Sequence, residues 1–431
     1  MSSNNLPGSP FVAYKNDALH VEGVALAALA AEHQTPLFVY SKAAMLSALR
    51  AYQRGFAGRN ALICYAMKAN SSLAVLQLFA QNGCGFDIVS GGELVRVLKA
   101  GADPQKVIFS GVGKTRAEMR QALNVGIACF NVESIPELDV LNEVALAMNK
   151  VAPISLRVNP NVDPKTHPYI STGLKGNKFG IAHEEALATY RHAASLKGLR
   201  VVGIDCHIGS QITTITPYLD AMDRVLDLVA SVEAAGIPIQ HIDFGGGLGI
   251  NYNGDTPPEA DALWAQLLAK IDASGFGSKQ LMIEPGRSLV GNAGVCVTEV
   301  IYTKTGSDKN FCIVDAAMND LPRPAMYQAY HGIVPCKLPA KLDGIRPARV
   351  PIYDVVGPVC ESGDWLGKDR ELDVVSGDLL VVLSTGAYCM AMASNYNTRG
   401  RPAEVLVDGG TATLIRIRET AEDQMTMERM L

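Results

Sequence analysis

The sequence predicts an α/β protein in which a (β/α)8 TIM barrel precedes a C-terminal, mainly β domain. From about residue 60 to residue 290, eight short apolar, β-branched runs alternate with helix-like stretches. Such alternation produces parallel strands covered by helices, and eight units over about 230 residues is the size of a closed barrel. After Arg287 the chain changes to β-rich runs separated by Gly and Pro turns, which indicates a second domain.

The barrel strands are predicted from apolar runs that begin near Leu62, Gly85, Val107, Ala128, Ile154, Val201, Ile239 and Leu281. Helix-like segments lie between them, at residues 73–82, 92–100, 115–124, 135–149, 217–235 and 257–273. A doubly wound open sheet is the main alternative. It would normally carry a glycine fingerprint after its first strand, and none follows the run that ends at Lys68.

The β domain is predicted from runs at residues 295–303, 311–314, 348–354 and 379–384. A further run at 37–40 would be a ninth strand, so the N-terminal stretch is expected to join the β domain. We therefore expect three parts: an N-terminal segment that joins the β domain, the barrel and the β domain itself, at residues 1–36, 37–288 and 289–431.

Composition narrows the classes of function. With 431 residues, two domains are the default. A net charge of −5 gives no reason to expect nucleic acid or a membrane as partner. No apolar run approaches the roughly 20 residues of a membrane span, and the N-terminus shows no signal peptide. Nine scattered cysteines without CxxC spacing favour a reduced, cytoplasmic protein, and eight histidines without HExxH spacing predict no metal site.

Lys68 closes the buried run 62–70, where a charged side chain is unusual. An amine held near an apolar surface loses proton affinity and becomes a nucleophile toward carbonyl groups, as a Schiff-base lysine requires. The alternative is a solvated lysine in the loop after the strand. Because the active site of a (β/α)8 barrel lies at the carboxyl ends of its strands, the residues after the other runs are candidates for the same site as Lys68.

The predicted seventh and eighth strands end in a phosphate-binding pattern. Gly245, Gly246 and Gly247 follow the seventh strand, and Gly286 and Arg287 follow the eighth. Consecutive glycine N–H groups can wrap a phosphate, and the loops after strands seven and eight form the usual phosphate site of this fold. A merely flexible turn is the alternative for the glycines.

Two further residues suit a pyridine cofactor. Glu284, at the end of the eighth strand, could keep a ring nitrogen protonated, or could serve as a capping or salt-bridge glutamate. His207, after the sixth strand, could stack on a flat ring, or could be a core histidine. A Schiff-base lysine, a phosphate cradle and an acid for a ring nitrogen are together required by one small molecule, pyridoxal 5′-phosphate (PLP).

These motifs resemble the alanine-racemase-like (fold type III) PLP enzymes and, within them, the diaminopimelate decarboxylases. The barrel motifs are 65–70 (YAMKAN), 207–211 (HIGSQ), 243–247 (DFGGG) and 284–287 (EPGR). Those of the β domain are 319–324 (NDLPRP), 360–364 (CESGD) and 386–388 (GAY), and 168–180 resembles the family's mobile loop. The resemblance extends from about Thr35 to Asn397.

The resemblance implies decarboxylation of meso-2,6-diaminopimelate to L-lysine and CO2, the last step of lysine biosynthesis, by a homodimer with shared active sites. Lys68 and Cys360 would be catalytic, and either could return the proton. The implied cofactor-binding residues are Lys68, Asp87, His207, Ser210, Gly245, Gly246, Gly247, Glu284, Gly286, Arg287 and Tyr388. The implied substrate-binding residues are Arg287, Arg323, Tyr327, Glu361 and Tyr388.

Arg323 carries the narrower choice of substrate. The distal end of diaminopimelate bears a carboxylate and an ammonium; a guanidinium matches the carboxylate with two hydrogen bonds, and Glu361 suits the ammonium. Other decarboxylases of this fold, acting on ornithine, arginine or carboxynorspermidine, are the first alternative. An amino acid racemase, a non-catalytic PLP carrier and, weakly, a metal enzyme are the others, since this fold alone does not fix a reaction.

Overall fold

The computed structural model describes residues 6–163, 172–173, 176–338 and 350–431. Contacts divide the chain into two units. The barrel unit consists of Ala48–Ile250 and Thr256–Ser288, and the β unit consists of Met1–Ser47, Asn251–Asp255 and Leu289–Leu431. Each unit is described by itself.

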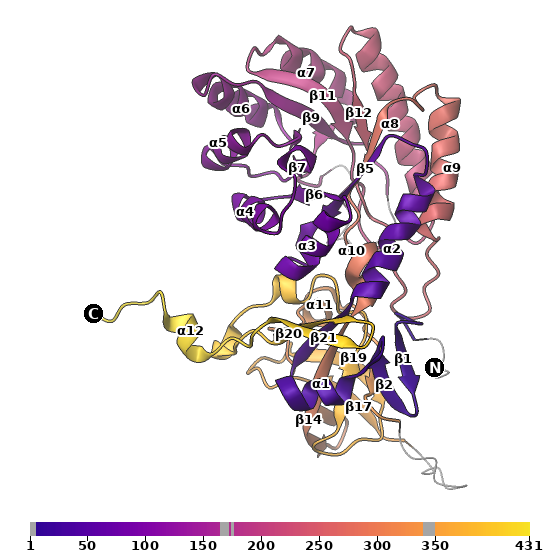
Figure 1. Ribbon diagram of the computed structural model, residues 1–431, viewed down its shortest axis with the longest axis vertical. Coiled ribbons are helices and arrows are strands. Elements are labelled where there is room, and N and C mark those ends of the chain that lie inside the picture. Colours follow the sequence, from indigo (N-terminus) through magenta and orange to yellow (C-terminus); the bar gives the residue numbers. More distant parts are fainter. Residues whose placement is uncertain (1–5, 164–171, 174–175, 339–349) are drawn as a thin grey trace. The chain divides into compact units, whose positions relative to one another are not determined.

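The barrel unit contains eight parallel strands that close on themselves (Figure 1). In chain order they are β5 (Ala61–Ala66), β6 (Gly85–Ile88), β7 (Val107–Phe109), β8 (Cys129–Val132), β9 (Ala152–Asn159), β11 (Leu199–Asp205), β12 (His241–Asp243) and β13 (Gln280–Ile283). Neighbours in the chain pair in register, and β13 pairs with β5, which closes the ring. The predicted barrel and its eight strands are confirmed; a two-residue strand, β10 (Ile181–Ala182), adds to β9.

Helices lie outside these strands (Figure 1). They are α2 (Lys42–Gly55), α3 (Leu73–Gln81), α4 (Gly91–Lys99), α5 (Arg116–Val125), α6 (Ile135–Ala147), α7 (His183–Ser195), α8 (Thr216–Ala234), α9 (Ala260–Ala273) and the short α10 (Arg287–Val290). Hydroxyl side chains begin several of them: Thr115 forms a capping box with Glu118, which satisfies two N–H groups that the helix leaves unpaired. The helix α7 was not among the predicted segments, and its buried face, formed by Ala186, Thr189, Tyr190 and Ala193, carries no large aliphatic side chain.

Strand periodicity places a polar layer on top of an apolar layer inside the barrel. Cys64, Ile108, Cys129, Val202 and Met282 form a buried cluster. Side chains two residues apart on a strand point to the same face. The residues two positions beyond three of these, namely Ser110, Asn131 and Glu284, are therefore carried inward at the carboxyl ends, and all three are buried.

The β unit is a twisted assembly of mainly antiparallel strands. Its largest sheet has the order β18-β17-β15-β14-β4-β20-β21, and β19 pairs with β14 and, on its other side, with β16. A small sheet β1-β2-β3 is separate from it. The strands are β1 (Val12–Lys15), β2 (Ala18–Val21), β3 (Val24–Ala25), β4 (Leu37–Ser41), β14 (Gly294–Thr305), β15 (Asn310–Val314), β16 (Ile333–Pro335), β17 (Ile352–Val356), β18 (Trp365–Glu371), β19 (Leu379–Val382), β20 (Ala403–Asp408) and β21 (Thr411–Arg416). Three helices accompany them: α1 (Leu26–His33), α11 (Arg323–Tyr327) and α12 (Ala421–Met425).

The units differ from the predicted domain boundaries in two places. The predicted barrel begins at residue 37, but β4 pairs with β14 and β20, and its buried Leu37 and Val39 belong to the core of the β unit. Residues 251–255, predicted within the barrel, also group with the β unit. Part of the predicted strand 348–354 lies outside the described residues, and β17 begins at Ile352.

Within the described ranges, no helix combines the length and apolar character that crossing a membrane would require. All nine cysteines are described and are free thiols. Eight of them are buried, and Cys360 is exposed.

Candidate active site

Lys68 lies just beyond the carboxyl end of β5. The strand ends at Ala66, and Lys68 sits in a one-turn 3-10 helix over Met67–Ala69 rather than on the strand itself. Its Nζ lies 2.7 Å from Oδ2 of Asp87, whose side chain is fully buried, whereas 38% of the Lys68 side chain is exposed. The amine is therefore held by an ion pair at an accessible position, and not in the wholly apolar setting that the sequence suggested.

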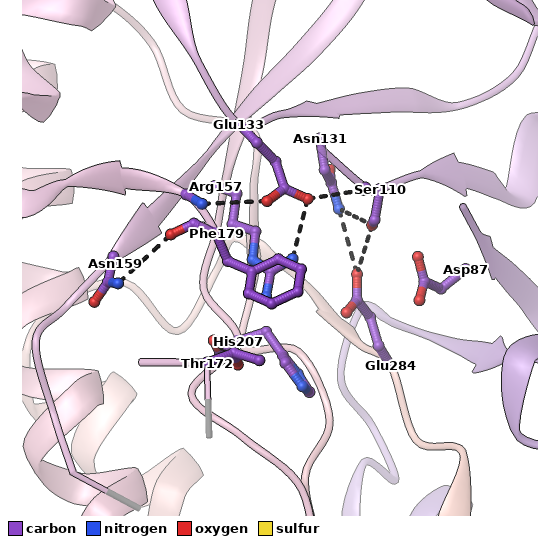
Figure 2. Close-up of polar contacts among 12 residues, drawn as sticks. Asp87, Ser110, Asn131, Glu133, Arg157, Asn159, Thr172, Phe179, His207 and Glu284 are labelled. Carbon is purple, nitrogen blue, oxygen red and sulfur yellow. Dashed lines mark hydrogen bonds and ion pairs between the residues drawn. The ribbon is translucent and has the colours of Figure 1, made fainter. Parts of the chain in front are cut away.

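Glu284 is the centre of a buried polar network (Figure 2). Its Oε1 accepts hydrogen bonds from Ser110 Oγ at 3.5 Å and from Asn131 Nδ2 at 3.3 Å. Asn131 also donates to Ser110 Oγ at 3.2 Å and accepts from Ser155 Oγ at 2.5 Å. In the part of the chain that the structure describes, Oε2 of Glu284 has no hydrogen-bond partner, so this oxygen remains available to a ligand.

Burial raises the pKa of Glu284 well above its usual range, and the nearby carboxylates of Asp87, Asp243 and Asp205 raise it further. Burial, with the carboxylates of Asp205 and Asp87, also raises the pKa of Asp243. Burial brings the pKa of Asp205 to about 7, although the cation of Arg157 acts to lower it. A raised pKa favours the protonated form of a buried carboxyl group. In that form Glu284 can share its proton with a basic ring nitrogen.

Asp205, Asp243 and Glu284 also bring one oxygen each within 4.8 Å of one another. Among the described residues this is the one group of metal-ligand side chains with such spacing. Their raised pKa values favour bound protons over a bound cation, because burial penalises the ionised carboxylates that a metal needs.

His207 presents a neutral imidazole beside this network. Its Nδ1 accepts a hydrogen bond from the N–H of Gly246 at 3.1 Å, so the proton of the neutral ring is on Nε2. Burial lowers the pKa of His207 well below its usual value, and the cations Arg157 and Lys68 lower it further. A neutral, flat and partly accessible ring suits stacking on an aromatic cofactor.

The three glycines after β12 are required by close packing. Gly245 and Gly247 have φ angles of +64° and +105°, which side chains rarely adopt. A Cβ on Gly246 would lie 2.2 Å from the carbonyl oxygen of Glu284, and one on Gly247 would lie 2.6 Å from that of Gly209. These contacts argue against a merely flexible turn.

Arg287 completes this side of the barrel. It is buried, and its Nη2 donates to Ser210 Oγ at 2.9 Å. Gly286 packs against β5: a Cβ there would lie 3.2 Å from that of Ala66, whose N–H donates to Pro285 O at 3.0 Å. The loops after three strands thus meet beside the lysine turn, and they combine a guanidinium, a hydroxyl and glycine backbone, the groups that bind a phosphate.

In the β unit, Cys360 and Glu361 occupy one exposed loop. The N–H of Cys360 donates to Asn397 Oδ1 at 2.9 Å, and the hydroxyl of Tyr396 donates to Glu361 Oε2 at 3.1 Å. Asp364 closes the loop by accepting the N–H of Val359 at 2.7 Å. Two residues that are not reactive themselves therefore fix the backbone of the cysteine and the carboxylate of the glutamate.

Arg323 begins the short helix α11 and is buried, and Tyr327 ends the same helix. Tyr388 has a φ of +58°, an uncommon conformation for a residue with a side chain. It follows Gly386, where a Cβ would meet Val290 O at 1.8 Å, so a glycine is needed before the tyrosine.

The predicted site residues thus form two groups. The barrel unit brings together Lys68, Asp87, His207, Ser210, Gly245, Gly246, Gly247, Glu284, Gly286 and Arg287. The β unit holds Arg323, Tyr327, Cys360, Glu361 and Tyr388.

The chain is similar to known proteins over nearly its whole length. Residues 42–291 match the family model described as pyridoxal-dependent decarboxylase, pyridoxal binding domain. The chain is 53% identical over 412 residues to diaminopimelate decarboxylase of Neisseria meningitidis serogroup A, which spans 95% of this chain and 98% of that relative. The chain belongs to the diaminopimelate decarboxylase family.

Two further members of the family are similar over nearly the whole length. The enzyme of Pseudomonas aeruginosa is 52% identical over 420 residues, or 97% of this chain and 98% of that one. The crystal structure of diaminopimelate decarboxylase from M. jannaschii in co-complex with L-lysine is 38% identical, with a TM-score of 0.90, and covers 98% of this chain and 99% of that chain.

The barrel residues fit PLP, the cofactor of this family. Glu284 offers a proton and a free oxygen to a ring nitrogen, and His207 offers a neutral ring face. Arg287 and Ser210 lie beside the glycine loop, where a phosphate needs donors. Lys68 is accessible enough to reach an aldehyde. These groups follow the carboxyl ends of four strands, β5, β11, β12 and β13.

Sequence reasoning missed the residues that hold Glu284. The end of the third predicted strand looked undistinctive, yet Ser110 follows it directly and donates to Glu284. Asn131, near the carboxyl end of the fourth strand, was likewise not identified. Their positions at strand ends were a usable signal, because each lies two residues beyond a buried apolar residue on the same face.

Arg157 and Glu133 form a second buried pair that was not assigned a role, with Nη1 3.0 Å from Oε1 (Figure 2). The Arg157 guanidinium lies 4.9 Å from the ring centroid of Phe179, and the N–H of Gly180 donates to Glu133 Oε2 at 3.1 Å. The pair thus anchors the carboxyl end of the predicted mobile loop.

The rest of that predicted loop, 168–180, is described only in part. Residues 168–171 and 174–175 lie outside the described residues. Thr172 is described, and its hydroxyl donates to the carbonyl oxygen of His207 at 3.0 Å. The segment is therefore tied at Thr172 to the residue that is expected to face the cofactor ring.

Proposed function

We propose that this protein is a PLP-dependent carboxy-lyase that converts meso-2,6-diaminopimelate to L-lysine and CO2, the last step of lysine biosynthesis. The observation that carries the proposal is identity of about half the residues to curated diaminopimelate decarboxylases over nearly the full length of the chain. The L-lysine present in the structure of a relative is the product that this reaction would give.

PLP, when bound, supplies an electron sink for the electron pair that the departing carboxylate leaves behind. The chain's own residues prepare that sink. Lys68 would hold the cofactor covalently, and Glu284 would share its proton with the ring nitrogen. Ser110 and Asn131 keep the carboxyl group of Glu284 oriented through its other oxygen.

The β-unit residues are proposed to bind the substrate and return a proton. Arg323 would hold the distal carboxylate through two hydrogen bonds, and Glu361 would hold the distal ammonium. Arg287, Tyr327 and Tyr388 are proposed as further substrate contacts, and Tyr388 also as a cofactor contact.

Cys360 is proposed as the acid that protonates the α-carbon after CO2 has left, with Lys68 as the alternative donor. Its exposure supports this role, because the other eight cysteines of the chain are buried. The loop is held at the backbone by Asn397, which leaves the thiol itself outside this hydrogen bond.

The test is CO2 release by the PLP-loaded protein from meso-diaminopimelate, with L-ornithine, L-arginine and L-lysine in parallel. We expect release from diaminopimelate alone, with L-lysine as the other product. Release from one of the diamino acids instead would keep the cofactor assignment and overturn the substrate. No release from any of the four, with the visible absorbance of bound PLP present, would favour the racemase or the carrier.

We also propose a homodimer in which the Cys360–Glu361 loop completes the partner's site, working in the cytoplasm on a small amino acid, with no nucleic acid or membrane as partner. The exposed position of the loop supports the shared site. Mixing inactive Lys68→Ala and Cys360→Ala proteins and letting subunits exchange should restore about a quarter of the parent activity, because half of the dimers would hold one intact site. No recovery, with exchange shown by differently tagged subunits, would refute the shared site.

A further inference from the structure

Arg323 is a buried cation whose partners within the described residues are neutral. Arg323 is only 6% exposed. Its Nη1 donates two hydrogen bonds, to Tyr252 Oη at 2.8 Å and to His331 Nε2 at 2.9 Å. A buried guanidinium without an anion is costly, so a ligand carboxylate is a favourable partner for it. The Nε–Nη2 edge, which forms a two-pronged fork, makes neither of these bonds.

The hydrogen bonds of His331 define its protonation. Its Nδ1 lies 2.8 Å from the carbonyl oxygen of Leu383, which can only accept, so Nδ1 carries the proton. Arg323 can only donate, so Nε2 of His331 must be the unprotonated nitrogen. His331 is fully buried and lies beside the β16–β19 ladder, where the N–H of Leu383 donates to Gly332 O at 2.8 Å. The ring is therefore a rigid, neutral acceptor.

Tyr252 holds the guanidinium from another direction. The Arg323 guanidinium lies 4.7 Å from the Tyr252 ring centroid, and the Tyr252 and His331 rings meet edge to face at 5.3 Å and 78°. The loop that carries Tyr252 is closed on itself, since Asp255 Oδ2 accepts the N–H groups of Tyr252 at 2.9 Å and of Asn253 at 3.2 Å. The contacts of Tyr252 with Arg323 and His331 explain why residues 251–255 group with the β unit.

We propose that His331 and Tyr252 are positioning residues for substrate specificity: they bind Nη1 of Arg323 and leave its Nε–Nη2 edge to receive the distal carboxylate of the substrate. The inference rests on the proposed function, because it takes Arg323 as the reader of that carboxylate. Neither residue touches the reacting carbon, so both should act on binding more than on the chemical step.

The ligand series for the test follows from the reaction. Because L-lysine is the product, it keeps the distal carboxylate of diaminopimelate, whereas cadaverine (1,5-diaminopentane) is L-lysine without it. Competition by each compound against meso-diaminopimelate therefore isolates the contribution of the carboxylate. The visible absorbance of bound PLP reports separately on the barrel.

The variants are His331→Leu, which removes the acceptor, His331→Gln, whose Oε1 can replace Nε2, and Tyr252→Phe, which removes only the hydroxyl. We expect His331→Leu to raise KM for meso-diaminopimelate and to weaken L-lysine on the order of 10-fold each, as for a lost hydrogen bond to a charged group. Binding of cadaverine, kcat and the PLP absorbance should change little. His331→Gln should restore most of the loss, and Tyr252→Phe should show a smaller loss of the same kind.

Three outcomes decide the matter. The expected pattern supports the proposal. If Arg323→Ala weakens L-lysine but His331→Leu and Tyr252→Phe leave it unchanged, the positioning role is refuted and the reading of Arg323 survives. If Arg323→Ala itself leaves L-lysine and meso-diaminopimelate unaffected, the proposed substrate pocket is refuted. Should His331→Leu not fold, as seen from its thermal transition, Tyr252→Phe carries the same test, and its unchanged binding of L-lysine would overturn the proposal.

Discussion

The polar layer of the barrel unit and the Cys360–Glu361 loop of the β unit solve different problems. Around Glu284, buried side chains from neighbouring strands hold one carboxyl group through fixed hydrogen bonds. Around Cys360 and Glu361, the reactive side chains are exposed, and only the loop backbone and one carboxylate are held. The first arrangement is complete within one chain, whereas the second presents groups outward.

The difference indicates a division of labour. A buried network with raised pKa values is suited to tuning the cofactor. Groups on loops and short helices can change without disturbing the barrel, so they are suited to reading the substrate. Substitutions in the two regions should therefore have separable effects, the largest of them at Cys360.

Replacing Cys360 by Ala should remove the proposed acid and lower kcat by about 10²–10⁴-fold, the usual contribution of a positioned acid. The visible absorbance of PLP should be unchanged, because the barrel residues are intact. Steady-state kinetics on meso-diaminopimelate and an absorbance spectrum measure both. A loss of less than about threefold would contradict the role of Cys360 and transfer it to Lys68.

Arg323→Ala should discriminate between two substrates. Because the product is L-lysine, the distal carboxylate of meso-diaminopimelate is the one on the L-centre, and D-lysine is the compound that lacks it. We expect the fall in kcat/KM for meso-diaminopimelate to correspond to a loss of transition-state stabilisation of about 2–5 kcal/mol, the cost of truncating one partner of a buried charge pair. The value of kcat/KM for D-lysine should change much less. Equal losses on the two substrates would be inconsistent with a carboxylate reader.

Asp205→Asn should change the pH dependence of stability in the PLP-free protein. The folded-state pKa of Asp205 is about 7, above the unfolded value of about 3.9, so the folded protein binds the extra proton between these pH values. Stability is therefore lost as pH rises from 4 to 7, and the uncharged Asn avoids that loss.

The free energy of unfolding of Asp205→Asn minus that of the parent should consequently be on the order of 2–4 kcal/mol larger at pH 8 than at pH 4. Urea unfolding at the two pH values measures this difference. A difference between variant and parent that does not depend on pH would show that Asp205 does not carry the proton.

Asn397→Ala should have the smallest effect. It removes the acceptor of the Cys360 N–H in an exposed loop, so we expect kcat to fall only several-fold, as for a hydrogen bond worth about 1 kcal/mol. Asn397→Asp keeps an acceptor oxygen and serves as the matched control. If the two variants lose the same activity, the hydrogen bond is not what positions Cys360.

The sequence predicted the barrel half of the site better than the β half. Strand ends of a barrel meet in one place, so Lys68, Glu284 and the glycines could be combined by position alone. No comparable rule places Cys360 or Arg323 in the β unit, and these were found only through resemblance to a family. Neutral residues such as Ser110 and His331 were missed because their importance comes from partners distant in the sequence.

The predicted start of the barrel at residue 37 differs from that of the barrel unit for a similar reason. The run that became β4 is apolar on both faces, as a barrel strand would be, and its partners β14 and β20 lie more than 250 residues away in the chain. Long-range pairing of this kind leaves no local pattern. The register of the strands, and not their composition, decides to which unit β4 belongs.

The most direct test of the division applies one substitution to both regions, as Glu284→Gln and Glu361→Gln, in PLP-loaded protein. Visible absorbance and steady-state kinetics on meso-diaminopimelate are recorded for each. We expect Glu284→Gln to alter the cofactor spectrum and lower kcat, and Glu361→Gln to leave the spectrum unchanged and mainly raise KM. An unchanged spectrum and kcat in Glu284→Gln, or an altered spectrum in Glu361→Gln, would contradict this division.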